Sequence, residues 1–203
     1  MKPLSNNDRD LFLEKKITYE EAFEVISKMK GSAPGPNGLT INFYKKFFPY
    51  FGNYFVEILN DYDSCLTDTF NRVNIKLIPK NSKRIKGIND LRPISLTNYE
   101  YRIFTKILSN RLHKLSSLLI GDHQTCGILG RRMNDNIILL RDLIEDAIRK
   151  EKVLNVISVD QRKAFDSISH NYLFGLIKNL NFGNFMYKNI TRLYEKSYAN
   201  III

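Results

Sequence analysis

The stretch that most constrains the fold runs from Val153 to Asp166 and reads VLNVISVDQRKAFD. Its first part, Val153–Val159, is apolar apart from Asn155 and Ser158 and is rich in β-branched side chains. That pattern predicts a strand buried on both faces of a sheet. Asp160 follows the predicted strand directly.

A carboxylate at the end of a buried strand is held rigidly. Burying it without a partner costs several kcal/mol, so we expect Asp160 to point at solvent or at a cation. The sequence therefore marks Asp160 as a candidate metal ligand and catalytic residue. The simpler alternative is an aspartate that ends the strand and caps the following helix.

The block VISVDQRKAFDSI resembles motif A of the reverse transcriptases of LINE-type (non-LTR) retrotransposons. That motif is an apolar strand, an Asp, two or three variable residues and then Lys-Ala-Phe-Asp. The resemblance implies that Asp160 binds two Mg²⁺ ions, helped by the backbone carbonyl of Gln161. It also implies that Phe165 lies under the sugar of the incoming nucleotide, where an aromatic ring would exclude a ribose 2′-hydroxyl. Phe165 as a core aromatic is the alternative, and Asp166 is expected to be a capping or turn residue.

Nucleotidyl transfer explains why such residue types are needed. Divalent cations neutralise charge on the attacking and leaving oxygens, and Mg²⁺ prefers hard oxygen ligands with substrate phosphates completing its octahedron. One carboxylate does not hold two such ions.

Composition sets broad limits on the class of protein. With 203 residues and 43% hydrophobic content, the chain is long enough to bury a core, as one domain or two small ones. No apolar run reaches the length of a membrane span, and the first residues lack the apolar centre of a signal peptide. We therefore expect an intracellular protein, in the nucleus or cytoplasm, without a membrane partner. The two cysteines, Cys65 and Cys126, do not form the Cys-x₂₋₄-Cys pair of a zinc site.

The net charge of +10 is concentrated in one part of the chain. Between residues 72 and 114, eleven basic residues stand against two acidic ones, a local charge of +9. Such a stripe is typical of a surface that binds a phosphate backbone, and a solvated basic face is the alternative. The basic residues are Arg72, Lys76, Lys80, Lys83, Arg84, Lys86, Arg92, Arg102, Lys106, Arg111 and Lys114.

Two strands are predicted within this basic stripe. Residues 73–80 alternate apolar and polar side chains, the polar run 81–90 forms a loop, and 91–96 begins a returning strand whose Pro93 favours an edge. The pair resembles the fingers hairpin of LINE-type and group II intron reverse transcriptases. The resemblance implies that Lys80 and Arg92 contact the incoming triphosphate. A guanidinium grips phosphate oxygens with two hydrogen bonds, whereas pairing of Arg92 with Asp90 or Glu100 would be a structural role.

Helices are predicted on both sides of the hairpin. Thr18–Glu21 is a capping box that starts one helix, residues 40–60 form one aromatic-rich helix or two, and another helix is expected from Arg102. The segment SAPGPNGLT between the first two is a loop similar to the Lys-x-Pro-Gly-Pro-Asp-Gly segment of LINE-type elements, with Asn37 in place of the Asp. The aromatic row in 40–60 is either core or a surface that stacks on bases.

Further similarity to the family surrounds residue 130. GDHQTCGILGRRMNDNI is similar to the block Asp-x-Gln-x-Gly-Phe/Cys-x-x-Gly-Arg-x-x-x-Asp-Asn. Arg131 in this block is expected to bind template phosphate or to hold a carboxylate. Arg84 and Lys86 of the hairpin loop are further candidate nucleic-acid contacts. After motif A, residues 172–180 and 185–194 are predicted helices, and the last residues are β-like.

The order of these blocks implies an α+β fold, a partial right-hand polymerase with an incomplete palm sheet. We expect an N-terminal extension with the Pro/Gly loop over 1–39, a fingers subdomain over 40–150 and a partial palm with motif A over 151–203. The implied partners are an RNA template, a DNA primer, deoxynucleoside triphosphates and the remainder of the polymerase, with Mg²⁺ as the cofactor of the complete enzyme.

The family's Tyr/Phe-Ala-Asp-Asp hairpin, which carries the partner carboxylates, has no match in the sequence, which contains no Asp-Asp pair. We therefore expect little or no polymerase activity from this chain alone, because Asp160 would face its metals without a partner. The alternative is a non-catalytic nucleic-acid-binding remnant that uses the basic stripe 72–114. A third possibility is a decayed sequence that does not fold stably, since half a palm leaves sheet edges uncovered.

Overall fold

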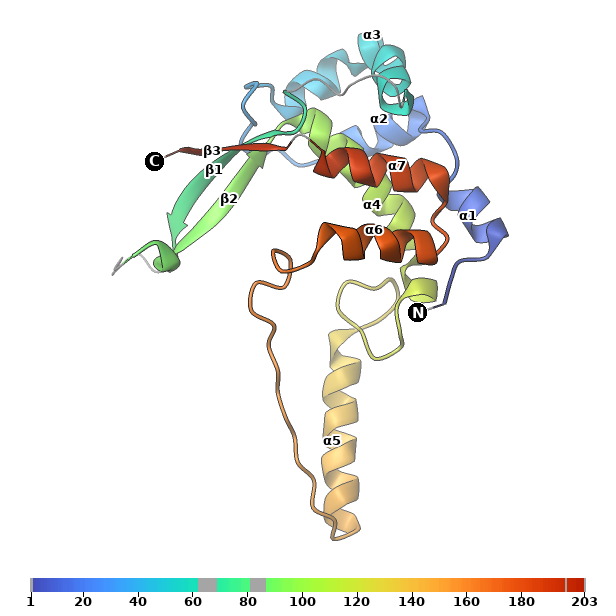
Figure 1. The fold of residues 1–203 in the computed structure, drawn as a ribbon, viewed down its shortest axis with the longest axis vertical. Coiled ribbons are helices and arrows are strands. Elements are labelled where there is room, and N and C mark those ends of the chain that lie inside the picture. Colours follow the sequence, from blue (N-terminus) through green and yellow to red (C-terminus); the bar gives the residue numbers. More distant parts are fainter. Residues whose placement is uncertain (1, 62–68, 81–86, 196, 203) are drawn as a thin grey trace. The chain divides into compact units, whose positions relative to one another are not determined.

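A computed structural model describes residues 2–61, 69–80, 87–195 and 197–202 (Figure 1). Seven helices, one short 3₁₀ helix and three strands follow one another in this part of the chain. In order they are α1 (Asn6–Phe12), α2 (Tyr19–Lys28), α3 (Ile41–Asn60), β1 (Arg72–Pro79), η1 (Ile88–Asp90), β2 (Leu91–Thr97), α4 (Tyr99–Leu119), α5 (Met133–Arg149), α6 (His170–Asn179), α7 (Gly183–Tyr194) and β3 (Tyr198–Ile202). The predicted α+β class is confirmed.

The chain divides into two compact units. One comprises Lys15–Asn110 with Asn184–Ile203, and is called here the hairpin unit; the other comprises Met1–Glu14 with Arg111–Gly183, and is called the motif A unit. The subdomain boundaries expected from the sequence, 1–39, 40–150 and 151–203, remain a prediction.

Helices α2, α3 and α4 supply much of the core of the hairpin unit, and α7 adds the buried residues Phe185 and Met186. Thr18 caps α2 as predicted, its Oγ1 accepting the Glu21 N–H at 3.2 Å. Apolar side chains recur every three or four residues along α2, α3 and α4, so each helix has one buried face. The buried residues of these helices include Ala22, Val25, Ile26, Ile41, Tyr44, Phe48, Leu59, Tyr99, Ile103, Phe104 and Ile107.

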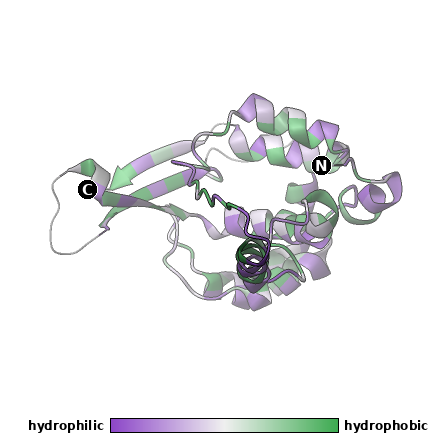
Figure 2. Cartoon of the chain, turned by 90° about the horizontal axis from the view of Figure 1, so that it is seen from below, coloured by the Kyte–Doolittle hydropathy of each residue, from purple (hydrophilic) through white to green (hydrophobic). Residues whose placement is uncertain are grey.

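The sheet of the hairpin unit has the strand order β2-β1-β3. β1 and β2 are antiparallel, with Ile78 opposite Arg92, and Figure 2 shows hydrophilic and hydrophobic residues alternating along the strands. Pro93 lies on β2, an edge strand, where its missing N–H removes no ladder bond to an outer neighbour. The predicted hairpin is thus confirmed.

β3 confirms the β-like end of the chain and pairs with β1 in parallel, with Ile75 opposite Ile201. Asn71, just before β1, fixes the approach to β3, because its Nδ2 donates to the carbonyls of Arg192 at 3.2 Å and Glu195 at 2.8 Å. These bonds satisfy carbonyls at the C-terminal end of α7, which would otherwise have no helical partner.

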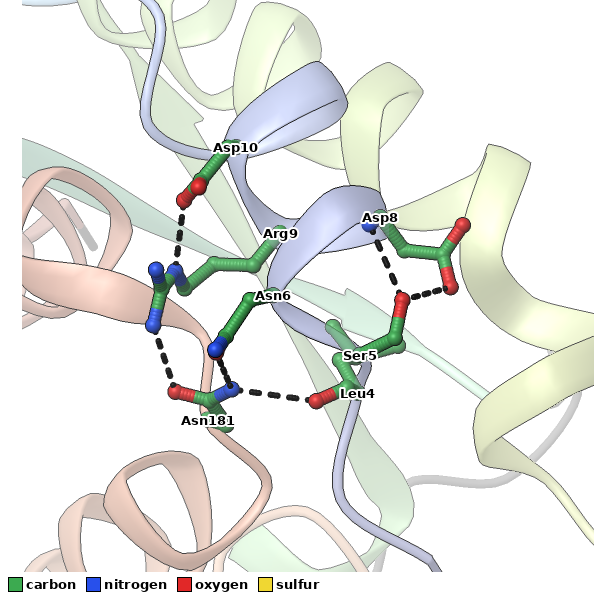
Figure 3. A network of polar contacts seen from close by, with 7 residues as sticks. All are labelled: Leu4, Ser5, Asn6, Asp8, Arg9, Asp10 and Asn181. Carbon is green, nitrogen blue, oxygen red and sulfur yellow. Dashed lines mark hydrogen bonds and ion pairs between the residues drawn. The ribbon is translucent and has the colours of Figure 1, made fainter.

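In the motif A unit, the N-terminal residues pack on the turn between α6 and α7 (Figure 3). Asn181 adopts a left-handed φ of 59° and its Nδ2 donates to the Leu4 carbonyl at 3.0 Å and to Asn6 Oδ1 at 3.2 Å. Its Oδ1 accepts from Arg9 Nη1 at 3.0 Å, and the Leu4 N–H donates to the Leu180 carbonyl at 3.0 Å. Asparagine tolerates this backbone conformation better than most residues, so one side chain serves both the turn and the N-terminus.

Replacing Asn181 separates these two roles. Asn181→Gly keeps the backbone freedom and loses the side-chain bonds, so we expect a loss of about 1–2 kcal/mol in the free energy of unfolding. Asn181→Ala loses the bonds and also strains the turn, and we expect about 1 kcal/mol more. Urea unfolding followed by circular dichroism gives both values; equal losses in the two variants would show that the left-handed conformation carries no cost.

The predicted strand Val153–Val159 is wrong. These residues form no regular secondary structure, and their side chains are exposed, with Val153 91% and Ile157 83% exposed. A strand is stable only when a neighbour accepts its backbone hydrogen bonds, and in the described ranges the three strands pair only with one another. An apolar β-branched run favours a strand, but it does not supply the neighbouring strand with which it would have to pair.

α5 is the helix that precedes motif A. Asp135 lies at the N3 position of α5, where its Oδ2 accepts the N–H of the N-cap residue Arg132 at 3.2 Å. None of the residues of α5 is buried, and Ile137 is 64% and Ile148 72% exposed. Within the part of the chain that the structure describes, no helix combines the length and apolarity needed to cross a bilayer.

Candidate nucleotide and nucleic-acid interface

The β1–β2 hairpin places Lys80 and Arg92 at the same end. Lys80 follows β1 directly, and its N–H donates to the Asp90 carbonyl at 2.8 Å, which continues the ladder one step past Pro79. Arg92 pairs with Ile78, two residues before Lys80, so both basic residues take positions on one face of the hairpin. Both side chains are exposed.

The structural alternative for Arg92 was pairing with Asp90 or Glu100. Among the described residues, no ion pair reaches Arg92, and the Glu100 carboxylate accepts hydrogen bonds from Asn37 instead. Arg92 therefore presents its guanidinium to solvent at the hairpin end. The expected nucleic-acid contacts Arg84 and Lys86 lie outside the described residues.

The loop 31–39, which carries the Pro/Gly segment, is hydrogen-bonded to the base of the hairpin. Asn98, between β2 and α4, is 2% exposed, and its Oδ1 accepts the Asn37 N–H at 3.1 Å while its Nδ2 donates to the Thr69 carbonyl at 2.8 Å. Both polar ends of this buried amide are thus satisfied. The loop, the start of β1 and the end of β2 meet on one side chain.

Tyr99 and Arg102 hold the other end of this loop. The Tyr99 hydroxyl accepts the Ser32 N–H at 2.9 Å and donates to the Ser32 carbonyl at 3.0 Å. Arg102 stacks on the Tyr99 ring at 4.7 Å, and it donates to Ser32 Oγ at 2.7 Å and to the Ala33 carbonyl at 2.9 Å. Asn98, Tyr99, Glu100 and Arg102 together are called the loop clamp below.

Asn37 stands where the similar family segment has an aspartate. Its contact with Glu100 of the loop clamp explains why an uncharged side chain suits this position. Asn37 Nδ2 donates to both carboxylate oxygens of Glu100, at 2.9 and 3.1 Å. Burial, and next a hydrogen bond to Glu100, raise the pKa of the Tyr44 hydroxyl, so Tyr44 stays a neutral donor to the same carboxylate. An aspartate at 37 would bring a second negative charge to Glu100.

Asn37→Asp is expected to destabilise the chain by about 1 kcal/mol at neutral pH, a modest value because the pair is exposed to solvent. Repulsion between the two carboxylates raises their pKa values in the folded state above those in the unfolded state. The loss should therefore be present above the folded-state pKa and disappear as the pH falls through it. Thermal unfolding at pH 7 and pH 4 measures this, and Glu100→Gln in the Asn37→Asp background is the control that should restore stability at pH 7.

Residues of motif A lie in the other unit, on an exposed segment. Asp160 and Gln161 are exposed and outside regular structure, and Phe165 is 94% exposed, so it is not a core aromatic here. A turn orders the Lys-Ala-Phe-Asp residues, because the Ser167 N–H and Oγ both donate to the Lys163 carbonyl, at 3.0 and 2.5 Å. Lys163 adopts a left-handed φ of 51° in this turn.

The donors present do not make up a magnesium site by themselves. In the described ranges, no three Asp, Glu, His or Cys side chains come together, and Asp160 stands as a single carboxylate. Mg²⁺ binds through one or two carboxylates when substrate phosphates complete its shell, so Asp160 alone is an incomplete ligand set.

The Arg131 guanidinium makes its hydrogen bonds to residues of the motif A unit. It donates to the carbonyls of Gly121 at 2.5 Å, Gln124 at 2.8 Å and Ile120 at 3.0 Å, and it contacts the Asp122 carboxylate at 3.2 Å. These carbonyls follow the end of α4, where a cation also complements the helix dipole. Of the two roles expected for Arg131, the carboxylate contact is present, and template binding remains a prediction.

The sequence did not reveal a groove of about 670 Å³ between α2 and the first half of α4. Basic residues Lys28, Arg102 and Lys106 line it, with Glu24 paired to Lys28 at 2.5 Å. Arg102 and Lys106 belong to the basic stripe, but Lys28 comes from a distant helix. Only the packing of α2 beside α4 brings it to this surface.

Comparison with known proteins identifies the class. The family model described as "Reverse transcriptase (RNA-dependent DNA polymerase)" matches residues 78–200, more than half of the chain. The chain therefore belongs to the reverse transcriptase family.

The relatives point to LINE-type elements within that family. The chain is 33% identical over 184 residues to the "Transposon TX1 uncharacterized 149 kDa protein" of Xenopus laevis, covering 89% of this chain and 14% of that protein. It is 29% identical over 164 residues to the "Retrovirus-related Pol polyprotein from type-1 retrotransposable element R2" of Popillia japonica, covering 81% and 22%. The R2 polyprotein of Nasonia vitripennis is 27% identical over 178 residues, covering 80% and 15%. The chain is thus part of the reverse transcriptase domain of a LINE-type retrotransposon protein, and it spans less than a quarter of the length of these relatives.

Proposed function

We propose that this chain forms the fingers and the front of the palm of an RNA-directed DNA polymerase that extends a DNA primer on an RNA template. In this proposal Lys80 and Arg92 bind the triphosphate of the incoming deoxynucleotide, Phe165 lies under its sugar, and Asp160 with the Gln161 carbonyl contributes to the metal site. The observation that carries the proposal is the placement of two exposed cations, Lys80 and Arg92, at one end of a locked hairpin.

The chemistry of these cations suits a triphosphate. A planar guanidinium offers paired donors to phosphate oxygens, and an ammonium adds a point charge that does not require a fixed direction. Holding both on one paired hairpin lowers the entropy lost when the nucleotide binds. Binding of the nucleotide by this hairpin does not require the motif A carboxylate.

A direct test follows from that independence. A fluorescent deoxynucleoside triphosphate is titrated with the full chain, and the double variant Lys80→Gln/Arg92→Gln is expected to weaken binding by at least about tenfold. Lys2→Gln/Lys152→Gln, which removes two exposed charges elsewhere, is the control matched for net charge. Equal weakening in both double variants would show that total charge, rather than the hairpin site, attracts the nucleotide.

Catalysis requires more than this chain supplies. Magnesium is the cofactor proposed for the complete polymerase, where it would neutralise charge on the reacting phosphates. In primer extension on an RNA template with deoxynucleotides and Mg²⁺, we expect no product above the background without enzyme. Robust extension by the purified 203 residues would overturn the predicted inactivity.

A non-catalytic nucleic-acid-binding role is the second candidate, and the groove lined by Lys28, Arg102 and Lys106 favours it. Phosphate contacts of this kind weaken steeply with salt. If this role is right, RNA binding survives Asp160→Ala, and Lys106→Gln lowers the slope of log affinity against log salt by about one.

A further inference from the structure

Helix α3 carries a second apolar face in addition to its core face. The core face is formed by Ile41, Tyr44, Phe48, Gly52, Val56 and Leu59, all buried. The opposite side carries side chains at spacings of four, three, four and four residues, which places them in one row along the helix. This row, called the aromatic stripe, consists of Phe43, Phe47, Tyr50, Tyr54 and Ile58.

The aromatic stripe is open to solvent. Tyr50 is 82% and Tyr54 71% exposed, the largest exposed fractions among the large apolar and aromatic residues of the helix, and Phe47 is 40% and Ile58 53% exposed. Phe43 is half-buried and supports the row, with its ring centroid 5.1 Å from that of Phe47. A continuous apolar row of this kind on a surface marks a binding site more often than a single exposed ring does.

The chemistry of the stripe favours nucleic acid over an apolar protein surface. Its most exposed members are tyrosines, whose rings have flat faces for stacking and whose hydroxyls remain hydrated. Two exposed lysines lie in the same first half of α3, and Lys46 Nζ lies 5.4 Å from the centroid of the Phe47 ring. Rings that stack on bases beside cations that meet phosphates are the combination that binds single strands.

We propose that the aromatic stripe of α3 binds single-stranded nucleic acid, with bases stacked on Tyr50, Tyr54 and Phe47 and phosphates near Lys45 and Lys46. Helical spacing places the Cβ atoms of neighbouring residues in the row about 5–6 Å apart. The exposure of Tyr50 and Tyr54 leaves their rings accessible to the bases of an unpaired strand. A duplex hides its base faces, so the stripe discriminates against it. The inference rests on the proposed function in that a polymerase on an RNA template meets such a strand before the template is copied.

The test measures the affinity of the full chain for a labelled 20-nucleotide oligo-adenylate by fluorescence anisotropy. Tyr50→Leu/Tyr54→Leu removes the rings and keeps an apolar surface, and it is expected to weaken binding by at least about tenfold. Binding to a 20-base-pair RNA duplex should change by less than about twofold in the same variant. Tyr172→Leu is the matched control, because Tyr172 is 66% exposed on α6, outside the stripe, and both affinities should remain at the wild-type value.

Two further measurements keep the outcomes distinct. Tyr50→Phe/Tyr54→Phe retains the rings and is expected to bind oligo-adenylate within about twofold of wild type. Circular dichroism and thermal unfolding establish that each variant is folded. Unchanged oligo-adenylate affinity in the Leu variant, no binding by the wild-type chain, or a parallel loss for the duplex would each overturn the proposal. Failure of the nucleotide titration or of primer extension would not affect this result, because the anisotropy assay uses neither nucleotide nor catalysis.

Discussion

Gly35→Ala is expected to lower the free energy of unfolding by at least about 3 kcal/mol, a fall in Tm of roughly 6–12 °C for a chain of this size. A Cβ at position 35 would lie 2.4 Å from the Asn98 backbone nitrogen and 2.5 Å from the Thr97 carbonyl carbon. Those are backbone atoms at the junction of β2 and α4, so no side-chain rotation relieves the contact. The loop 31–39 would have to lift from the loop clamp, breaking the Asn98 hydrogen bond to Asn37.

Gly31→Ala is the matched control within the same loop. Its added Cβ would have its nearest neighbour, Ile41 Cγ2, at 4.0 Å, an ordinary van der Waals distance. We expect its stability to stay within about 0.5 kcal/mol of wild type or to rise slightly, because alanine restricts the unfolded chain more than glycine does. Differential scanning calorimetry on both variants measures the contrast; similar melting temperatures would mean that the close approach at Gly35 is not tight.

The loop clamp bears on the proposed nucleotide site because of the hairpin that it positions. Asn98 joins the loop to Thr69, next to β1, and it directly follows β2, so the clamp sets the direction in which the hairpin leaves the helices. Lys80 and Arg92 are at the far end of that hairpin. A small change of angle at the base moves the far end more, and a triphosphate site tolerates little misplacement. We therefore expect Gly35→Ala to weaken deoxynucleotide binding although Gly35 contacts no proposed nucleotide ligand.

The parts of the fold that the sequence predicted correctly are those with their own local signal. Thr18 with Glu21 starts α2, alternation over 73–80 predicts β1, and helical periodicity predicts the last two helices over 172–180 and 185–194. Each of these depends on neighbours within a few residues along the chain. The pairing of β1 with β2 was likewise predicted from the single polar run 81–90 that separates them in sequence.

Features that depend on a distant partner were not predictable in the same way. Val153–Val159 has the composition of a buried strand, yet it forms none because burial and pairing depend on another strand. Nothing local to Lys28 indicates that α2 packs where its side chain lines a groove with Lys106. The family resemblance added the candidate roles of Lys80, Arg92 and Asp160, and those roles remain proposals.

The aromatic row of 40–60 shows a third situation, in which the sequence left two uses open: the structure divides the rings between the core and the solvent, and stacking on bases is a proposal for the exposed ones. Phe48 is fully buried and Tyr54 is 71% exposed on the same helix. Helical phase decides which ring is buried and which is exposed, because with 3.6 residues per turn the two side chains point about 120° apart around the helix axis. The phase could have been fixed from the sequence only by knowing which face α2 and α4 cover.

The second large effect is expected at Tyr99, whose replacement by alanine should cost about 4–5 kcal/mol. The ring is fully buried, its hydroxyl bonds both backbone groups of Ser32, and its face supports the Arg102 guanidinium. Alanine would leave a cavity in the core, an unsatisfied Ser32 N–H and a guanidinium without its ring. Tyr99→Phe removes only the hydroxyl and is expected to cost about 1–3 kcal/mol, the range for leaving a partly buried donor unpaired.

Urea unfolding of Tyr99→Ala, Tyr99→Phe and the exposed-site control Tyr172→Phe separates packing from hydrogen bonding at the loop clamp. Because the Phe variant keeps the core filled but releases Ser32, it should also speed proteolysis within loop 31–39 while the rest of the chain stays protected. If Tyr99→Phe is as stable and as resistant as wild type, the hydroxyl is not an anchor, and the loop is held by Asn98 and Arg102 alone. If both Tyr99 variants unfold equally easily, the hydrogen bonds dominate and the cavity contributes little. The expected order, Ala well below Phe and Phe below wild type, follows only if the ring and its hydroxyl act through different neighbours.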